Sequence, residues 1–191
     1  MLSLVLGYGD STDHTDALLF EACSGGIGAR LIDCAHGGPA YTSVVDAQRF
    51  KQLAFVGNKI FANVPDDADA IIWLESDLIW SPETIVELLN HLQWHACVAP
   101  AIMDSPPANT WYDSWAFRKD GLRFTKEPPF HPSLSAGMNK MDSVGSCVAI
   151  NVPEFHRLTV PDDTVIVGVC EQIRALGGSV WCDTSLTVYH P

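Results

Sequence analysis

Short apolar runs alternate with helix-like segments along this chain, and that alternation constrains the fold more than any other feature. The runs predict strands at residues 2–6, 29–34, 70–74, 95–103, 142–151 and 179–190. Apolar spacing and capping residues predict helices at 13–23, 43–63, 81–91 and 164–176. Repeated strand–helix–strand units are typical of an α/β fold with a mostly parallel sheet flanked by helices. The proline-rich stretch 104–140 is expected to be irregular.

The segment 70–74 is the clearest of the predicted strands. Its residues are apolar on both faces, as a strand in a covered parallel sheet requires. Ser81, Pro82 and Glu83 then provide a cap, a first-turn proline and a first-turn acid, which together predict the start of a helix. Ligands of parallel α/β sheets bind at the carboxyl ends of the strands. The residues that directly follow the apolar runs are therefore the candidates for function.

A chain of 191 residues, 47% of them hydrophobic, is expected to form one domain over residues 1–191 and to bury a core without disulfides. Its 23 acidic and 11 basic residues give a net charge of −12. This balance argues against nucleic acid and anionic membranes as partners, because both require lysine and arginine. The excess acid is expected to serve mainly solubility. No apolar run reaches the length of a membrane span, and six cysteines without a C-x-x-C pair indicate buried thiols and a reducing, cytoplasmic location.

Acidic residues follow the strand at 70–74. Glu75 and Asp77 are two positions apart, so both carboxylates can approach one divalent cation or its water shell. An acidic turn that caps the next helix is the alternative reading. Potential ligands also follow the first and last apolar runs, where the sequence has Asp10, Ser11 and Asp13, and His190. Three strand ends at one sheet edge suggest a cleft for a nucleotide and a metal ion.

Six segments resemble motifs of GT-A fold glycosyltransferases, in the same order along the chain. The segments are GDSTDHT (9–15), RFKQLAFVGNK (49–59), IIWLESDLIWSPET (71–84), WYDSWAFR (111–118), MDSVGSCVAI (141–150) and CEQIRALGGSVWCDTSLTVYH (170–190). The middle segments resemble fungal capsule-associated and Golgi mannan-polymerase-type mannosyltransferases, with a wider similarity to family 2-like transferases. The resemblance covers nearly the whole chain.

The resemblance implies a metal-dependent transferase that moves a hexose from a GDP- or UDP-linked donor to a glycan or another hydroxyl acceptor. Mn²⁺ or Mg²⁺ would be held by Asp77 and His190, and Glu75 would face the ribose or a metal-bound water. Residues 1–103 would form the half that binds nucleotide and metal, and residues 104–191 the acceptor half. A degenerate, non-catalytic module that binds carbohydrate or nucleotide is the alternative.

Further roles follow from the same resemblance. Asp10, Ser11 and Asp13 would lie near the nucleoside, while Arg49 and Asn58 would organise the cleft or contact the phosphates. Gly145 would let the backbone approach the donor sugar. The acceptor would contact an aromatic segment, because sugars stack on aromatic rings while charged groups bind their hydroxyls. Its candidate residues are Tyr112, Asp113, Trp115 and Arg118, although Trp115 could equally pack in the core.

The chain departs from the family pattern in three places. The first acid of the metal motif is Glu75 where the family has aspartate. Many members begin with a further strand and helix, so residues 2–6 replace that strand or the chain lacks it. Inverting members also carry an acidic pair where this chain has Val165 and Ile166. The nearest acids, Asp162 and Asp163, either serve as base or cap the helix, and Asp142 is another possible acid. This departure favours a retaining mechanism.

Overall fold

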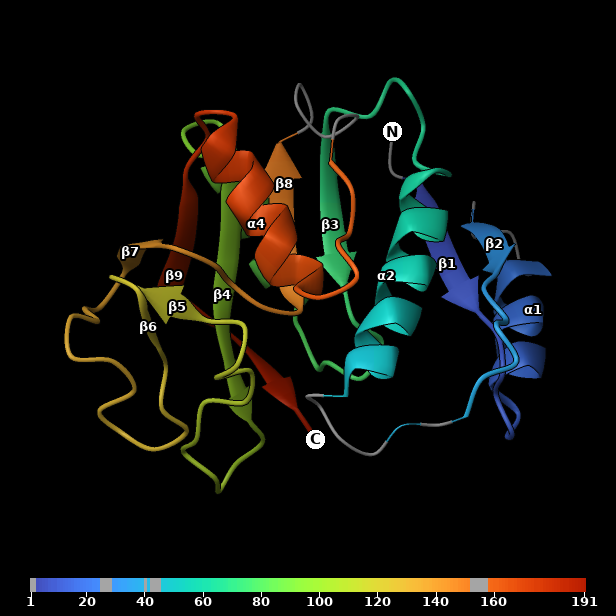
Figure 1. Cartoon of the computed structure of the whole chain (residues 1–191), viewed down its shortest axis with the longest axis horizontal. Coiled ribbons are helices and arrows are strands. Elements are labelled where there is room, and N and C mark those ends of the chain that lie inside the picture. Colours follow the sequence, from blue (N-terminus) through green and yellow to red (C-terminus); the bar gives the residue numbers. More distant parts are fainter. Residues whose placement is uncertain (1–2, 25–28, 40, 42–45, 152–157) are drawn as a thin grey trace. The chain divides into compact units, whose positions relative to one another are not determined.

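A computed structural model describes residues 3–24, 29–39, 41, 46–151 and 158–191 (Figure 1). Two compact units divide the chain: unit 1 comprises Met1–Asp66 and Thr159–Val165, and unit 2 comprises Asp67–Leu158 and Ile166–Pro191. The contacts therefore divide near residue 66, and the division into a nucleotide-binding half, 1–103, and an acceptor half, 104–191, stays a prediction. Each unit is described by itself below.

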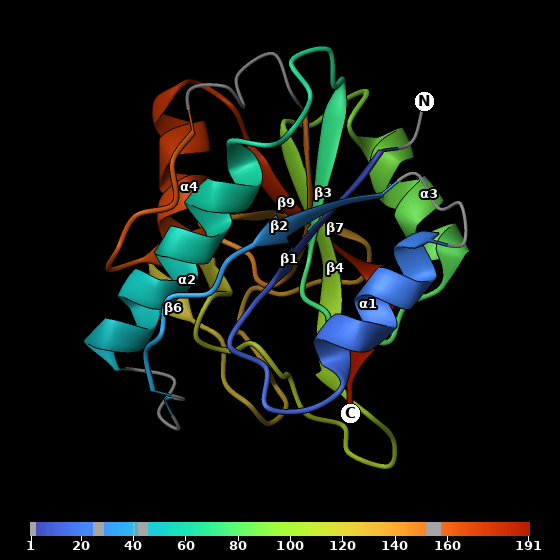
Figure 2. The same cartoon turned by 90° about the vertical axis from the view of Figure 1, so that its right-hand side faces the viewer.

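Unit 1 contains the parallel strand pair β1 (Leu4–Tyr8) and β2 (Ala29–Asp33), which lies between helices α1 (Thr15–Ser24) and α2 (Ala47–Phe61) (Figure 2). All four elements were predicted from the sequence. Local capping explains both helix starts, because Asp13 accepts a hydrogen bond from the backbone N–H of Thr15 and Asp46 accepts one from that of Gln48. The predicted break at 25–28 and the predicted helix start at 43 lie outside the described residues.

Unit 2 is built on a five-stranded sheet in the order β3-β8-β4-β9-β7. Its strands are β3 (Ala70–Leu74), β4 (Cys97–Asp104), β7 (Met138–Met141), β8 (Cys147–Asn151) and β9 (Val180–His190). Strand β8 pairs antiparallel with both β3 and β4, β4 pairs parallel with β9, and β9 pairs antiparallel with β7. Strands β3, β4 and β9 thus share one direction, which β7 and β8 oppose. The sheet is mixed, so the prediction of a mostly parallel sheet is wrong.

The connections between strands explain this outcome. Helix α3 (Pro82–His91) joins β3 to β4 and provides the crossover that two parallel strands require. Between β4 and β8 the described chain has no helix, and the irregular segment returns it in the opposite direction. Strand β8 is nearly as buried as β4, so its apolar pattern does not distinguish the two orientations.

Two helices cover the sheet of unit 2. Helices α3 and α4 (Val165–Ala175) lie on opposite faces of it (Figure 2). Leu88 of α3 and Val169 of α4 are fully buried, as are Val98 and Val148 in the sheet between them. The start of α3 follows the sequence prediction, because Ser81 caps it by accepting the backbone N–H of Thr84. The core of this unit is therefore a sheet enclosed on both sides.

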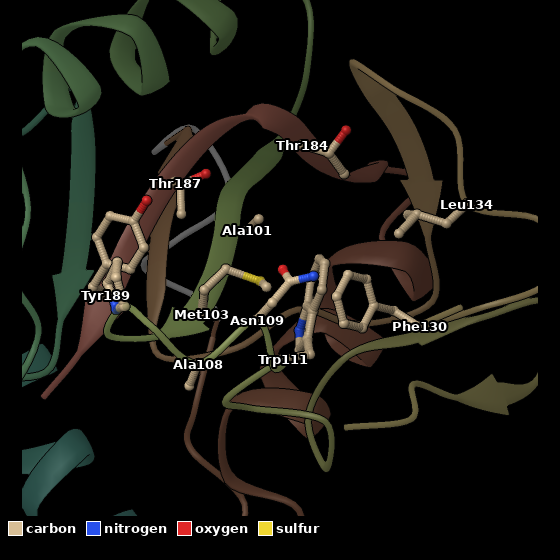
Figure 3. A pocket seen from close by; sticks show the side chains of 11 residues that line it. Ala101, Met103, Ala108, Asn109, Trp111, Phe130, Leu134, Thr184, Thr187 and Tyr189 are labelled. Carbon is tan, nitrogen blue, oxygen red and sulfur yellow. The ribbon is translucent and has the colours of Figure 1, made fainter. Parts of the chain in front are cut away.

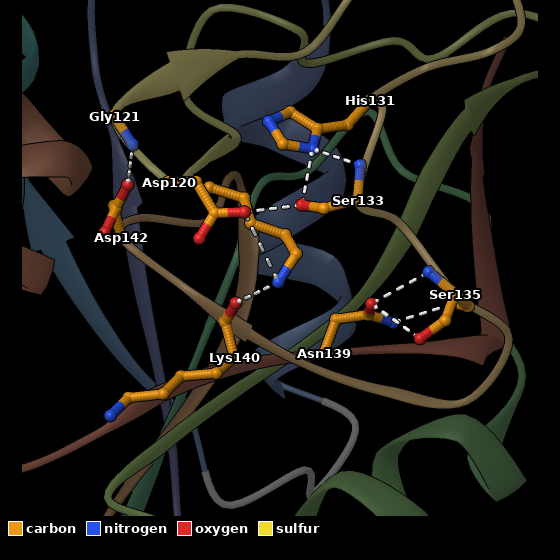
Figure 4. Close-up of polar contacts among 9 residues, drawn as sticks. Asp120, Gly121, His131, Ser133, Ser135, Asn139, Lys140 and Asp142 are labelled. Carbon is orange, nitrogen blue, oxygen red and sulfur yellow. Dashed lines mark hydrogen bonds and ion pairs between the residues drawn. The ribbon is translucent and has the colours of Figure 1, made fainter.

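The stretch predicted to be irregular contains a short hairpin, β5 (Arg118–Lys119) and β6 (Leu122–Arg123). Its two turn residues, Asp120 and Gly121, both have positive φ, which is why an Asp-Gly pair suits this turn. Figure 4 shows the contacts that hold the hairpin, in which Asp142 accepts the Gly121 N–H and Asp120 accepts the Ser133 hydroxyl. The hairpin is thus held by side chains of loop residues and not by pairing with a larger sheet.

Candidate functional site

The segment after β3 and the end of β9 are joined by backbone hydrogen bonds. Ile79 and Tyr189 exchange two of them, at 2.7 and 2.9 Å. This bridge brings the predicted ligands Asp77 and His190 together, with 3.4 Å between the aspartate Oδ2 and the histidine Nε2. The carboxyl ends of β3 and β9 therefore meet as predicted, whereas β1, the third predicted strand end, belongs to a separate two-stranded sheet.

The imidazole of His190 is oriented by an aromatic ring. Tyr112, a predicted acceptor residue, stacks on it with ring centroids 3.7 Å apart and planes 8° apart. The backbone N–H of Tyr112 donates to the carbonyl of Ile102, which fixes the tyrosine beside β4. The ring plane of His190 is therefore set by packing, and its Nε2 lies next to Asp77.

The pair Asp77 and His190 fits two ligands of one cation. Ligand atoms about 2.1 Å from a cation at angles of about 90–110° are roughly 3.0–3.4 Å apart, which matches the observed separation. Both side chains are accessible, at 52% and 26% exposure. Across the described residues, however, no three His, Cys, Asp or Glu side chains are close enough to hold a metal ion. Glu75 is placed by its backbone N–H, which donates to Ser146, and its metal role stays a prediction.

Asp104 belongs to the same edge and was missed by the sequence analysis. It ends β4 and is the register partner of His190. Its carboxylate accepts the Thr110 hydroxyl and lies 3.4 Å from the Lys126 ammonium. These contacts, above all the Thr110 hydrogen bond, outweigh burial and lower the pKa of Asp104. The rule that functional residues follow apolar runs, applied to 95–103, would have found it.

Asp113 and Gly145 form a structural contact. The Asp113 Oδ2 accepts the backbone N–H and the hydroxyl of Ser146, at 3.2 and 3.0 Å. A Cβ atom at position 145 would lie 2.1 Å from that oxygen. The absence of a side chain at Gly145 is therefore required by Asp113. The predicted approach of a donor sugar to Gly145 and the predicted acceptor contact of Asp113 stay predictions.

Trp115 and Arg118 also contact each other. The Arg118 guanidinium lies 5.5 Å from the centre of the Trp115 ring, and that of Arg123 lies 5.8 Å from it. Burial lowers the pKa of Arg118, as does the nearby Arg123. Trp115 is half-buried beneath these cations. The cation–ring contact gives Trp115 and Arg118 a structural role that needs no bound acceptor. Binding of an acceptor to these two residues stays a prediction.

Two of the three predicted acids, Asp142 and Asp163, have local partners. Asp142 accepts the Gly121 N–H at 2.7 Å and lies 3.5 Å from the Arg174 guanidinium. Asp162 is exposed in the turn before α4, and Asp163 accepts the Thr164 hydroxyl at 3.1 Å. None of these contacts is a cap of α4, and a catalytic role for any of the three stays a prediction.

The predicted donor residues lie in unit 1. Asp10 joins the carboxyl ends of β1 and β2, because its carboxylate accepts the backbone N–H groups of His36 and Gly37. The His36 hydrogen bond is the main cause of its lowered pKa. Ser11 is exposed beside it, and Arg49 is half-buried in α2. Asp13 caps α1, and its pKa is lowered mainly by the Thr15 hydroxyl.

Asn58 holds two distant segments of unit 1 together. Its amide nitrogen donates to the carbonyl of Val160 at 2.9 Å, and its amide oxygen accepts the Val160 N–H at 2.8 Å. Val160 is only 2% exposed. The residue thus satisfies both backbone groups of a buried position, which gives it a clear structural role. Its predicted contact with phosphate stays a prediction.

No family model matches the sequence, and no curated protein matches it either. The fold does match solved structures. GalNAc-T7, solved with UDP, GalNAc and Mn²⁺, aligns over 98% of this chain and 36% of its own, with a TM-score of 0.56 and 11% identity. The chain has a glycosyltransferase-like fold. A197 from STIV aligns over 100% of this chain and 86% of its own, with a TM-score of 0.51 and 11% identity.

At such low identity these matches show the fold alone, so the glycosyltransferase-like architecture is established separately from any activity. Among the described helices none is long and apolar enough to cross a membrane. All six cysteines are free, and every one except Cys23 is buried. Burial raises the pKa of Cys147 to about 12, which keeps that thiol protonated.

Proposed function

We propose that this protein is a metal-dependent glycosyltransferase that transfers a hexose from a GDP- or UDP-linked donor to a glycan or another hydroxyl acceptor. The observation that carries the proposal is the 3.4 Å approach of Asp77 and His190 at the strand ends of a glycosyltransferase-like fold. The neighbour solved with UDP, GalNAc and Mn²⁺ supports the choice of donor and cation. The acidic chain, with net charge −12, needs a cation to receive a diphosphate.

In this proposal Asp77 supplies a carboxylate oxygen and His190 an imidazole nitrogen to Mn²⁺ or Mg²⁺. The bound cation stabilises the negative charge that develops on the diphosphate leaving group. Tyr112 keeps the His190 ring in a fixed plane by stacking on it. Water and phosphate oxygens would have to supply the other ligands, as is typical of Mg²⁺ at nucleotide sites. Glu75 would contact the ribose or a metal-bound water.

A second candidate is a non-catalytic module that binds carbohydrate or nucleotide. It is favoured by two observations on the described residues. No three metal-ligating side chains gather at one place, and Asp142 and Asp163 are engaged in local contacts. Such a module would bind a donor without transferring its sugar.

The test replaces Asp77→Asn and, as a matched control, Asp69→Asn. Asp69 is exposed just before the amino end of β3, so the control removes the same charge away from the strand ends. UDP- and GDP-hexoses are assayed for transfer and hydrolysis with and without Mn²⁺. Asp77→Asn is expected to lose roughly 100-fold or more in turnover while its melting temperature stays unchanged, and Asp69→Asn should keep full activity.

Full activity in the Asp77→Asn variant would remove the metal role from Asp77. A wild-type protein that is stabilised by nucleotide sugar and Mn²⁺ but never turns the donor over would identify the binding module instead. Nuclear magnetic resonance of the product anomer then decides between the retaining mechanism, which the sequence favours, and the inverting one.

A further inference from the structure

A pocket of about 370 Å³ lies beside β4 and β9 in unit 2 (Figure 3). This volume is at the small end of the range of small-molecule sites, about 300–1,000 Å³. Trp111, Phe130 and Tyr189 are its aromatic lining residues, and Asn109 and Thr187 are among its polar ones. Residues of the loop that follows β4 line it together with Phe130. The pocket is therefore sized for a single small ring.

The pocket is separate from the Asp77–His190 pair. Met103 and its register partner Tyr189 line the pocket, whereas the next pair along, Asp104 and His190, belongs to the candidate site. Successive side chains on a strand point to opposite faces of the sheet. The chain segment that follows obeys the same alternation, because Trp111 lines the pocket while Tyr112 stacks on His190. The two sites thus lie on opposite faces of one strand pair.

No charged side chain lines this pocket. A phosphate or another anion would find no cation there, and the protein as a whole repels anions. Its lining instead combines aromatic rings with hydroxyl and amide groups. The indole N–H of Trp111 is buried and has no hydrogen-bond partner among the described residues. Thr187 lines the pocket from β9 and is half-buried. A neutral ring rich in hydroxyl groups matches such a lining, because its C–H face packs on aromatic rings while its hydroxyls bind the polar groups.

We propose that this pocket binds an uncharged hexose ring. The ring packs against the aromatic side chains, and its hydroxyl groups bind Asn109 and Thr187. Figure 3 shows Asn109 and Trp111 beside Met103 at the centre of the lining. The proposal needs neither nucleotide nor metal, so its test is independent of the proposed transferase activity, and the two can fail separately.

The experiment titrates the whole chain, without metal or nucleotide, with the methyl glycosides of glucose, galactose and mannose. Binding is followed by ¹H–¹⁵N spectra, which report the backbone and the indole N–H groups. Cyclohexylmethanol serves as an apolar ring of similar size, and glucose 1-phosphate as a charged probe. At least one methyl glycoside is expected to bind saturably with a Kd on the order of 1–10 mM, and both comparison probes should bind at least roughly tenfold more weakly.

Two variants locate the binding. Thr187→Val keeps the side-chain shape and removes the hydroxyl, and Asn109→Leu removes the amide on an exposed loop. Each should weaken hexoside binding roughly fivefold, the loss expected for one hydrogen bond. Thr12→Val, which removes an exposed hydroxyl in unit 1, is the control and should not change it. The proposal is overturned if no methyl glycoside binds saturably or if cyclohexylmethanol binds as tightly as the best glycoside. It is also overturned if both pocket variants bind that glycoside with unchanged affinity.

Discussion

The contact between Asn58 and Val160 allows a quantitative test of how unit 1 is held together. Asn58→Ala removes both hydrogen bonds and leaves the N–H and C=O of a buried backbone position without partners. Each neutral hydrogen bond contributes about 1 kcal/mol, and each buried group left unsatisfied costs about 1–3 kcal/mol. Because these two effects overlap, the free energy of unfolding should fall by about 2–4 kcal/mol.

Asn63→Ala is the matched control. Asn63 lies just beyond α2, and its amide donates only to the carbonyl of Lys59, one helical turn earlier. The substitution is chemically the same but breaks a local contact, so the expected loss is below about 1 kcal/mol. Urea unfolding followed by circular dichroism measures both losses. Hydrogen exchange of the Val160 amide should accelerate in Asn58→Ala and stay unchanged in Asn63→Ala.

Two results would refute the reasoning. One is a loss in Asn58→Ala that is no larger than that of the control. The other is a protected Val160 amide in the variant, because that N–H would then have another partner. A donor-binding role for Asn58 predicts a different pattern, in which nucleotide stabilisation weakens while the unfolding of the free protein does not change.

Two further predictions follow from contacts in unit 2. Gly145→Ala should lower the free energy of unfolding by about 1–3 kcal/mol, because the new Cβ would displace the Asp113 carboxylate from Ser146. Calorimetry should show a smaller loss when the same substitution is made in an Asp113→Ala background. An equal loss in both backgrounds would contradict this mechanism. Burial alone would raise the pKa of Asp183, but hydrogen bonds from Ser185 and His91 outweigh it and lower that pKa. Its folded pKa is thus below its unfolded value, so the stability it contributes is present above about pH 4 and lost as the pH falls further. Asp183→Asn should flatten the decline in urea stability between about pH 5 and 3, and an unchanged slope would count against this assignment.

Local chemistry explains what the sequence predicted well. Strand β3 and the capped start of α3 were predictable because their signals lie within a few adjacent residues. The meeting of Asp77 and His190 was predictable because parallel strand ends share a sheet edge. The Asp120–Gly121 turn of the β5–β6 hairpin has an equally local signal, an Asp-Gly pair with positive φ at both residues.

The remaining features depend on contacts between distant residues. Asn58 binds a backbone position 102 residues later, and Asp113 binds Ser146, which is 33 residues away. No local pattern reveals such partners, so both side chains could only be interpreted as ligand contacts. The prediction that β8 runs parallel to its neighbours was wrong for the same reason. A buried strand has the same apolar sequence in either direction, and only its neighbours determine which direction it takes.

The placement of β8 between β3 and β4 also affects how the protein emerges from the ribosome. Strands β3 and β4, joined by α3, leave the exit tunnel before β8, but they do not pair with each other in the finished sheet. Until β8 is synthesised, both keep unpaired edges, and open strand edges readily join other chains.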